Sequence, residues 1–213
     1  MLSFKIVTLA LLCTSSSLAL PIRRELPQEH SHQQIITSVN TTAAARGAGS
    51  ITDTDCLQQA TADQAFTNAK AAGDIQAQVD ALIYRALERN THGVGVASNA
   101  CTSITAVNSE IAVLSQHQDP ASPNAAATNK AIVLKLASQI AAVGGNPQDA
   151  LKSGTFAPGN TSDKSGKGNT CDDHNDPVGC IFTQNLLVDD ASADEISEAA
   201  SSAHSTVSGS VSP

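Results

Sequence analysis

Residues 74–90, DIQAQVDALIYRALERN, decide the fold, because apolar side chains recur along them every three or four positions. This spacing places the apolar side chains on one side of an α-helix. Asp74 can cap this helix, which we expect to run to Asn90. Its apolar side comprises Ile75, Val79, Leu82, Ile83, Ala86 and Leu87. The charged residues are left for the outer side or the flanks, with pairs within the helix: Asp80, Arg85, Glu88 and Arg89.

Helical patterns continue on both sides of this segment. Upstream, a helix is predicted from Asp53 or Thr54 to about Ala72, and Gly73 ends it. Downstream, residues 101–118 show the same spacing and predict another helix. The apolar positions of this downstream helix are Ile104, Val107, Ile111 and Leu114.

A further long helix begins near Pro123, because Ser122 can cap it and proline is favoured at the first helical position. Gly144-Gly145 ends this helix, and Asn146-Pro147 begins a short one that reaches about Lys152. No stretch alternates between apolar and polar residues well enough to predict a sheet. We therefore expect an all-α fold. Its form is an antiparallel bundle of four to six helices, with a disulfide-closed C-terminal loop and flexible termini.

The N-terminal residues have the organisation of a secretory signal peptide. A positive charge precedes an apolar run that is too short to span a bilayer, and small residues lead up to Ala19. We expect cleavage after Ala19, and a second cleavage after Arg23-Arg24 by a kexin-type protease, so that the mature chain starts at Glu25. The predicted division is a signal peptide over residues 1–19 and a short propeptide over residues 20–24.

The composition of the mature chain changes along its length. Ile35, Ile36 and Val39 can line one side of a short helix in the leader, and Ser192 and Glu195 can form a capping box for a last helix. The predicted segments are a flexible leader with that short helix over 25–50, a helical domain over 51–200 and a disordered Ser-rich tail over 201–213. Two glycosylation sequons, which imply exposed segments, begin at Asn40 and Asn160.

Four cysteines remain once the signal peptide, which carries Cys13, is removed. An even number in a secreted chain predicts two disulfides, for which three pairings exist. The spacing favours Cys56–Cys101 and Cys171–Cys180. The first pair would join one long helix to the start of another, and the second would close a short loop.

Charge and aromatic content exclude some classes of partner. Loss of Lys5, Arg23 and Arg24 leaves 9 basic residues against 20 acidic ones, a net charge of −11 with histidine neutral. Such a chain repels nucleic acid and anionic lipid. The mature chain has no Trp and few aromatic side chains to stack on sugars or bases. These residues are Phe66, Tyr84, Phe156 and Phe182. We expect no nucleic-acid partner and no membrane span.

Three groups of residues are candidates for metal binding or catalysis. The run from Asp172 to Asp176 offers carboxylates to a hard cation, although its spacing is not that of an EF-hand, and the same residues commonly form turns. The metal candidates in this run are Asp172, Asp173 and Asp176. His30 and His32 could bind copper or zinc weakly from a mobile segment. His117 and Asp119 could suggest acid–base chemistry, but we favour a helix end followed by a turn.

Motifs of the common hydrolases, metalloproteases and phosphate-binding loops do not occur, which lowers the odds of an enzyme. We name no catalytic residue and no cofactor. Three functions stay open. The first is a non-enzymatic protein of the cell wall or extracellular matrix, with wall components or a host protein as its partner. The second is a helical carrier of a small apolar ligand, and the third is a hydrolase with an acidic site near residues 172–176.

Several stretches resemble a family of small secreted proteins of ascomycete fungi, usually labelled cell-wall or hypothetical secreted proteins. The likeness spans nearly all of the mature chain and is carried by Leu26–His32 after the dibasic pair, Asp55–Ala60, Ala81–Asn90, Pro147–Leu151 and Cys171–Leu187. The resemblance implies a filamentous fungus and an extracellular or wall location. A role as an effector or antigen at a host interface belongs to the first of the three functions above. It implies no catalytic residues.

Overall fold

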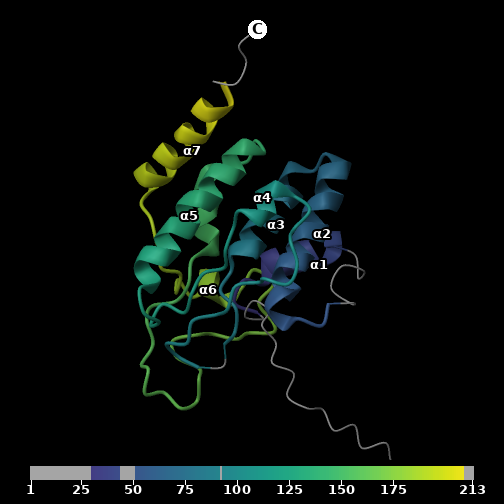
Figure 1. Cartoon of the computed structure of the whole chain (residues 1–213). Coiled ribbons are helices and arrows are strands. Elements are labelled where there is room, and N and C mark those ends of the chain that lie inside the picture. The colour runs from purple at the N-terminus through teal and green to yellow at the C-terminus, as the bar shows by residue number, and fades with distance from the viewer. Residues whose placement is uncertain (1–29, 44–50, 92, 209–213) are drawn as a thin grey trace, which may run out of the picture.

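The fold is all-α, as expected. A computed structural model of the chain describes residues 30–43, 51–91 and 93–208 (Figure 1). Within these ranges there is no β-strand, and an isolated antiparallel bridge joins Thr155 to Val188. No helix in them is both long and apolar enough to cross a membrane. The helices are α1 (Gln33–Ala43), η1 (Thr54–Cys56), α2 (Leu57–Ala72), α3 (Ile75–Ala86), α4 (Ser109–Ala112), α5 (Ala125–Ala142), η2 (Pro147–Ser153), α6 (Cys180–Thr183) and α7 (Ala193–Ser208).

Helix α3 lies at the centre of the molecule. It packs against α1 and α2 on one side and against α5 and η2 on the other (Figure 1). Every residue from 81 to 89 is buried, so the segment has no exposed side at its C-terminal end. Asp74 caps the helix by accepting a hydrogen bond from Ala77 N (3.0 Å), as predicted. Ile75 is the exception in the apolar stripe, since it is 47 % exposed at the first turn.

The turn between α2 and α3 depends on one glycine. Gly73 has φ +68°, the left-handed conformation that favours glycine, and its N–H bonds to Lys70 O (3.2 Å). Because only Asp74 separates it from the next helix, the chain reverses at once and α3 packs along α2.

Helix α1 belongs to the core. Ile35 and Val39 are buried in the same apolar cluster as α2 and α3, and Ile36 packs at its edge. The short helix was expected, but it was placed in a flexible leader. Residues 33–43 do not fit that description, because the bundle covers their apolar side. The helical domain therefore begins before residue 51.

The C-terminal half of the bundle is built on α5. Helix α7 packs along α5, and η2 fills the space between them and α3. Ser192 and Glu195 form the predicted capping box: Ser192 N donates to Glu195 Oε2 (3.0 Å) and Glu195 N donates to Ser192 Oγ (3.3 Å). The helix continues to Ser208, so residues 201–208 are helical where a disordered tail was predicted.

The predicted helix over residues 101–118 is wrong. Only Ser109–Ala112 is helical, and Val107 is 89 % exposed. The carboxylate of Asp63 in α2 accepts hydrogen bonds from Val107 N (2.7 Å) and Asn108 N (2.9 Å), which a continuous helix would use internally. Thr, Val and Ile are frequent in this segment and favour the helix little, so the contacts with α2 decide its shape.

The predicted disulfide pairing is confirmed. Cys56–Cys101 joins the start of α2 to an irregular segment, with Cα atoms 4.6 Å apart, and Cys171–Cys180 closes a short loop with Cα atoms 6.1 Å apart. The first bond does not reach a second long helix, because none begins at Cys101.

Candidate functional site

Two distant segments meet at one end of the bundle. Residues 30–34 lie against residues 178–181, and we call this pairing the N-terminal clasp. Three backbone hydrogen bonds hold it: Cys180 N to His30 O (3.1 Å), Ile181 N to Ser31 O (3.3 Å) and Gln34 N to Val178 O (3.0 Å). Gly179 permits the approach, since a Cβ there would lie 2.3 Å from Ser31 O.

The clasp brings His30 against the disulfide-closed loop. His30 Nδ1 donates to Asp172 Oδ1 (2.6 Å), and His174 Nδ1 lies 3.0 Å from His30 Nε2. His174 Nε2 is 3.9 Å from Asp172 Oδ2. One candidate ligand atom from each residue can be chosen so that all three lie within 4.8 Å of one another. Two imidazoles and one carboxylate form a donor set able to hold a divalent metal ion.

The three side chains differ in exposure. The side chain of His30 is 19 % exposed, whereas those of Asp172 and His174 are 61 % and 73 % exposed. The rings of His30 and His174 also contact each other, with centroids 3.9 Å apart. The cluster therefore has one fixed, sheltered member and two members that face solvent.

Only one of the three predicted acidic ligands takes part. Asp172 belongs to the cluster, but Asp173 accepts a hydrogen bond from Asn175 N (2.9 Å) and shapes the loop. Asp176 accepts from Val178 N (3.0 Å), Gly179 N (3.1 Å) and the hydroxyl of Thr183, which lower the pKa of Asp176. Asp173 and Asp176 therefore form turns, which was the alternative to metal binding that the sequence offered.

The histidine pair of the leader is divided between two environments. His30 joins the cluster, but His32 is buried and donates from Nε2 to Gly154 O (3.1 Å). Burial lowers the pKa of His32 to about 4, so its ring is neutral in the folded protein at neutral pH. His174 was missing from the predicted ligands. Its position two residues after Asp172 was the available signal, and its meeting with His30 depends on the fold.

His117 and Asp119 do not form a catalytic pair. The ring of His117 is fully buried and donates from Nδ1 to Ala86 O (2.6 Å), while Nε2 lies 3.4 Å from Asp190 Oδ2. Asp119 accepts a hydrogen bond from Ala121 N (2.8 Å) and forms a turn, as the sequence suggested. His117 follows an irregular segment and so does not end a helix.

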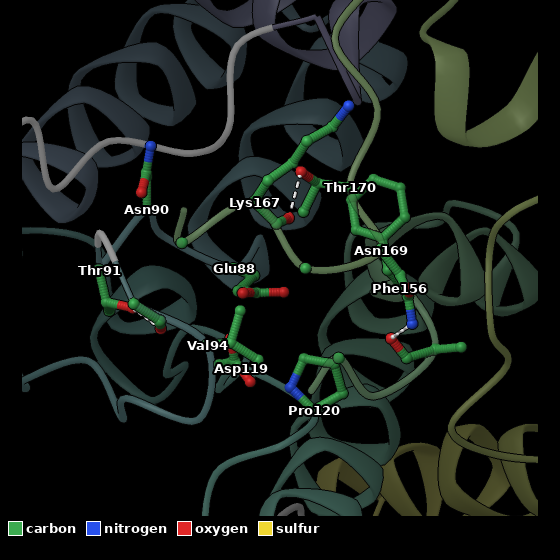
Figure 2. A pocket seen from close by; sticks show the side chains of 15 residues that line it. Glu88, Asn90, Thr91, Val94, Asp119, Pro120, Phe156, Lys167, Asn169 and Thr170 are labelled. Atoms are coloured by element: carbon green, nitrogen blue, oxygen red, sulfur yellow. Dashed lines mark hydrogen bonds between the residues drawn. The ribbon is translucent and has the colours of Figure 1, made fainter. Parts of the chain in front are cut away.

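Glu88 lies in the middle of a small pocket (Figure 2). Burial, together with the negative charges of Asp119 and Asp190, raises the pKa of Glu88 to about 8. The pocket holds about 30 Å³, room for no more than a few waters. The prediction that Glu88 lies on a helix surface is therefore wrong.

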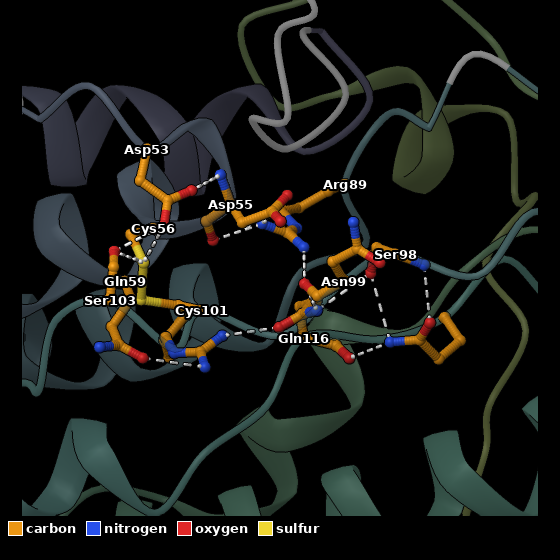
Figure 3. Close-up of polar contacts among 12 residues, drawn as sticks. Asp53, Asp55, Cys56, Gln59, Arg89, Ser98, Asn99, Cys101, Ser103 and Gln116 are labelled. Atoms are coloured by element: carbon orange, nitrogen blue, oxygen red, sulfur yellow. Dashed lines mark hydrogen bonds and ion pairs between the residues drawn. A yellow bond between two sulfur atoms is a disulfide. The ribbon is translucent and has the colours of Figure 1, made fainter.

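Arg85 and Arg89 are buried as well, contrary to the predicted surface pairs. Arg89 donates to Asp55 O and Asn99 O and so joins the chain on both sides of the Cys56–Cys101 bond (Figure 3). Arg85 donates to Gln116 Oε1 (3.2 Å) and Gln59 Oε1 (3.4 Å), and burial together with Arg89 lowers the pKa of Arg85 to about 10. These contacts tie three segments of the chain together.

An open groove runs between α5 and two irregular segments, residues 98–100 and residues 113–118, which lie before and after α4. Its apolar lining comes from Ala100, Val113, Ala127, Ala131 and Ile132. The groove is wide and faces solvent, whereas the predicted carrier needs an enclosed apolar space.

The predicted glycosylation sites lie within the described residues, and the predicted cleavage sites do not. Asn40 and Asn160 are both exposed, on α1 and on the loop after η2. Ala19, Arg23 and Arg24 lie outside the described residues.

Comparison with known proteins adds no family. No family model matches the chain, and neither does any curated protein or solved structure.

Proposed function

We propose that this protein works outside the cell, in the wall or surrounding medium of a filamentous fungus, as a non-enzymatic protein. The observation that carries the proposal is the pair of disulfides, Cys56–Cys101 and Cys171–Cys180. Such bonds persist in oxidising compartments and are rare in the cytosol. Together they close loops in both halves of the described chain.

The predicted processing is compatible with the fold. Cleavage after Ala19 and after Arg24 would remove residues that precede the first described contact, at His30. Every contact of the N-terminal clasp would remain. The exposure of Asn40 and Asn160 supports the same location, because a glycan can be accommodated only on an accessible asparagine.

The nature of the exposed site also favours binding over catalysis. The side chains of Asp172 and His174 are largely exposed, and Asp173 and Asp176 are engaged in turns. A hydrolytic site of the predicted acidic kind would need two carboxylates aimed at one enclosed space. A wall component or a host protein remains the partner that we propose.

Fractionation of the native fungus tests the proposal. The protein is followed by mass spectrometry through culture medium, salt wash and a reducing detergent extract of the wall, with a cytosolic enzyme as the control. We expect it in the medium or the wall extract, beginning at Glu25 and glycosylated at Asn40 or Asn160. Recovery with the cytosolic control, still carrying residues 1–24, would overturn the extracellular location.

Purified protein tests the non-enzymatic part. It is incubated with wall polysaccharides and wall proteins, and soluble products are measured. We expect no turnover. Turnover that disappears in the Asp172→Ala or Asp176→Ala variant would show that the chain is a hydrolase.

A further inference from the structure

We propose that His30, Asp172 and His174 bind one divalent transition-metal ion of the zinc and copper class. This inference goes beyond the proposed function, and it does not depend on where the protein works. It rests on three side chains from two distant parts of the chain, which offer ligand atoms within 4.8 Å of one another.

Side-chain rotation can bring the cluster to the size that a small ion requires. Donors around tetrahedral zinc, bonded at about 2.0–2.1 Å, lie roughly 3.3–3.4 Å from one another. In the structure His30 Nδ1 lies 2.6 Å from Asp172 Oδ1, and His30 Nε2 lies 3.0 Å from His174 Nδ1. His174 Nε2 lies 3.9 Å from Asp172 Oδ2. Because each side chain contributes two different atoms to these contacts, they do not measure one set of three donors. A set with one atom from each residue lies within 4.8 Å, a wider spacing than the ion requires. Asp172 and His174 are exposed, so small side-chain rotations can bring all three to the ion.

The backbone holds the donors in place before any ion arrives. His30 has φ +63° and its carbonyl accepts from Cys180 N (3.1 Å). Cys180 forms the disulfide with Cys171, and Asp172 is the next residue in the chain. One hydrogen bond, the disulfide and one peptide link therefore connect His30 to Asp172, and the clasp sets their separation.

The donor atoms select the class of ion. Calcium and magnesium prefer sites made almost wholly of oxygen, whereas imidazole nitrogen suits zinc, copper and nickel. With two nitrogens and one carboxylate, the cluster departs from the all-carboxylate calcium site considered from the sequence. Three protein ligands leave at least one position of a four-coordinate ion for water or for a group from another molecule.

The competing explanation is a hydrogen-bonded cluster without an ion. In it, His174 donates to His30 and His30 donates to Asp172, which satisfies these atoms. A metal ion replaces those two bonds by bonds to the metal. The two explanations differ in the response to added zinc or copper, so a direct titration separates them.

The test is a titration of the disulfide-intact, mature protein, without an affinity tag, with ZnCl₂ and separately with CuCl₂ at pH 7.5. Calorimetry gives the stoichiometry and the dissociation constant. We expect one ion per chain, and an affinity at least tenfold weaker for His174→Gln and for Asp172→Asn. Because both side chains are largely exposed, these variants should fold normally, and circular dichroism checks that they do.

Asp173→Asn is the matched control. It removes a neighbouring carboxylate of the same loop that lies outside the cluster, so its affinity should equal that of the original chain. NMR of the imidazole protons during the titration should show His30 and His174 shifting while His32 and His117 stay unchanged. The affinity should fall at pH 5.5, because protons compete with the ion for imidazole.

Two results would overturn the inference. One is the absence of binding to the original chain at 100 micromolar free ion. The other is binding that His174→Gln, Asp172→Asn and Asp173→Asn weaken equally or not at all, which would mean that the ion sits elsewhere or is held by diffuse negative charge.

Discussion

Glu88 is a buried acid among other acids. It lies at the end of the central segment, and its environment contains the carboxylates of Asp119 and Asp190. Burial and these charges favour the protonated form in the folded protein, with the pKa of Glu88 raised to about 8. In the unfolded chain the same group titrates near its ordinary value of 4.5. The folded state thus binds a proton that the unfolded state has released between these two pH values.

The first prediction follows from this difference. The contribution of Glu88 to the free energy of unfolding is fully present below pH 4.5, and it is lost as the pH rises toward 8. We expect the free energy of unfolding of the original chain to fall over this interval by a few kcal/mol more than that of Glu88→Gln, which cannot ionise. Denaturant titrations at pH 4.5, 6 and 8 measure it.

Glu198→Gln provides the control, because Glu198 is an exposed carboxyl on α7. Its pH dependence should follow that of the original chain. If Glu88→Gln also follows the original chain, then Glu88 ionises freely in the folded protein and its burial has no energetic effect.

The spacing of apolar residues along a helix does not show whether its polar residues are buried. The apolar stripe of residues 74–90 was correctly identified, but Arg85, Glu88 and Arg89 were assigned to its outer side. The opposite side of this segment is covered too, by segments that arrive from elsewhere in the chain. Gln58, for example, donates to Tyr84 O and Leu87 O (2.8 Å each). Ala86 O accepts from His117 N (2.8 Å), so the helix ends there and not at Asn90.

At the scale of the elements, α7 is attached through one face and begins with a capping box. Ser192→Ala removes the acceptor for Glu195 N and should lower the free energy of unfolding by about 1 kcal/mol. Thermal denaturation measures the loss. Ser202→Ala is the control within the same helix, because Ser202 is exposed and bonds only to the preceding turn. Equal stability of the two variants would mean that the box does not hold the helix.

The N-terminal clasp depends on Gly179. Gly179→Ala would place a Cβ 2.3 Å from Ser31 O, at a residue whose φ is +118°. We expect the clasp to open, with faster hydrogen exchange at Gln34 and Cys180 and a loss of stability of about 2 kcal/mol or more.

Gly73→Ala separates the two causes of this loss. Gly73 also has a positive φ, +68°, but an added Cβ would meet nothing within 4 Å. It should cost about 1–2 kcal/mol from backbone strain and leave exchange in the clasp unchanged. Slow exchange at Gln34 in Gly179→Ala would show that the clasp tolerates the side chain.

Local signals predicted the elements that local contacts build. Asp74 with Gly73, Asn146 with Pro147, and the Ser192 box all act within a few residues, and all were identified from the sequence. The helix predicted over residues 101–118 is wrong for the opposite reason, because distant contacts shape this segment. The backbone N–H groups of Val107 and Asn108 bond to Asp63, about 45 residues away, and the helical spacing of apolar residues does not reveal that contact.

At the scale of the whole molecule, the two disulfides close loops of different size. Cys56 and Cys101 are 45 residues apart, and Cys171 and Cys180 are 9 apart. Chain entropy predicts a loss of about 4 kcal/mol for the double variant Cys56→Ser, Cys101→Ser, against about 3 kcal/mol for Cys171→Ser, Cys180→Ser. Denaturant titration of both variants checks the order. If the loss of Cys171–Cys180 lowers the free energy of unfolding more, then this bond stabilises the protein mainly by holding the N-terminal clasp and not through chain entropy.

The candidate site shows the limit of prediction at this scale. Asp172 was named and His30 was considered, but as members of separate groups 142 residues apart. Only the path of the chain, with its return past α1, brings them together with His174. The pairing of the cysteines could be favoured from spacing, whereas the pairing of the histidines with the loop could not.

The Cys56–Cys101 bond also governs how the protein responds to being pulled. Fully extended, the stretch from Cys56 to Cys101, which are 45 residues apart, would span about 150 Å, but the bond holds their Cα atoms at 4.6 Å. A force applied at the two ends bypasses that whole stretch, including the central helix. When the oxidised molecule is stretched, the segments outside the loop can therefore unfold and extend, but the residues between Cys56 and Cys101 cannot. The bond thus limits the maximum length to which the chain can be pulled.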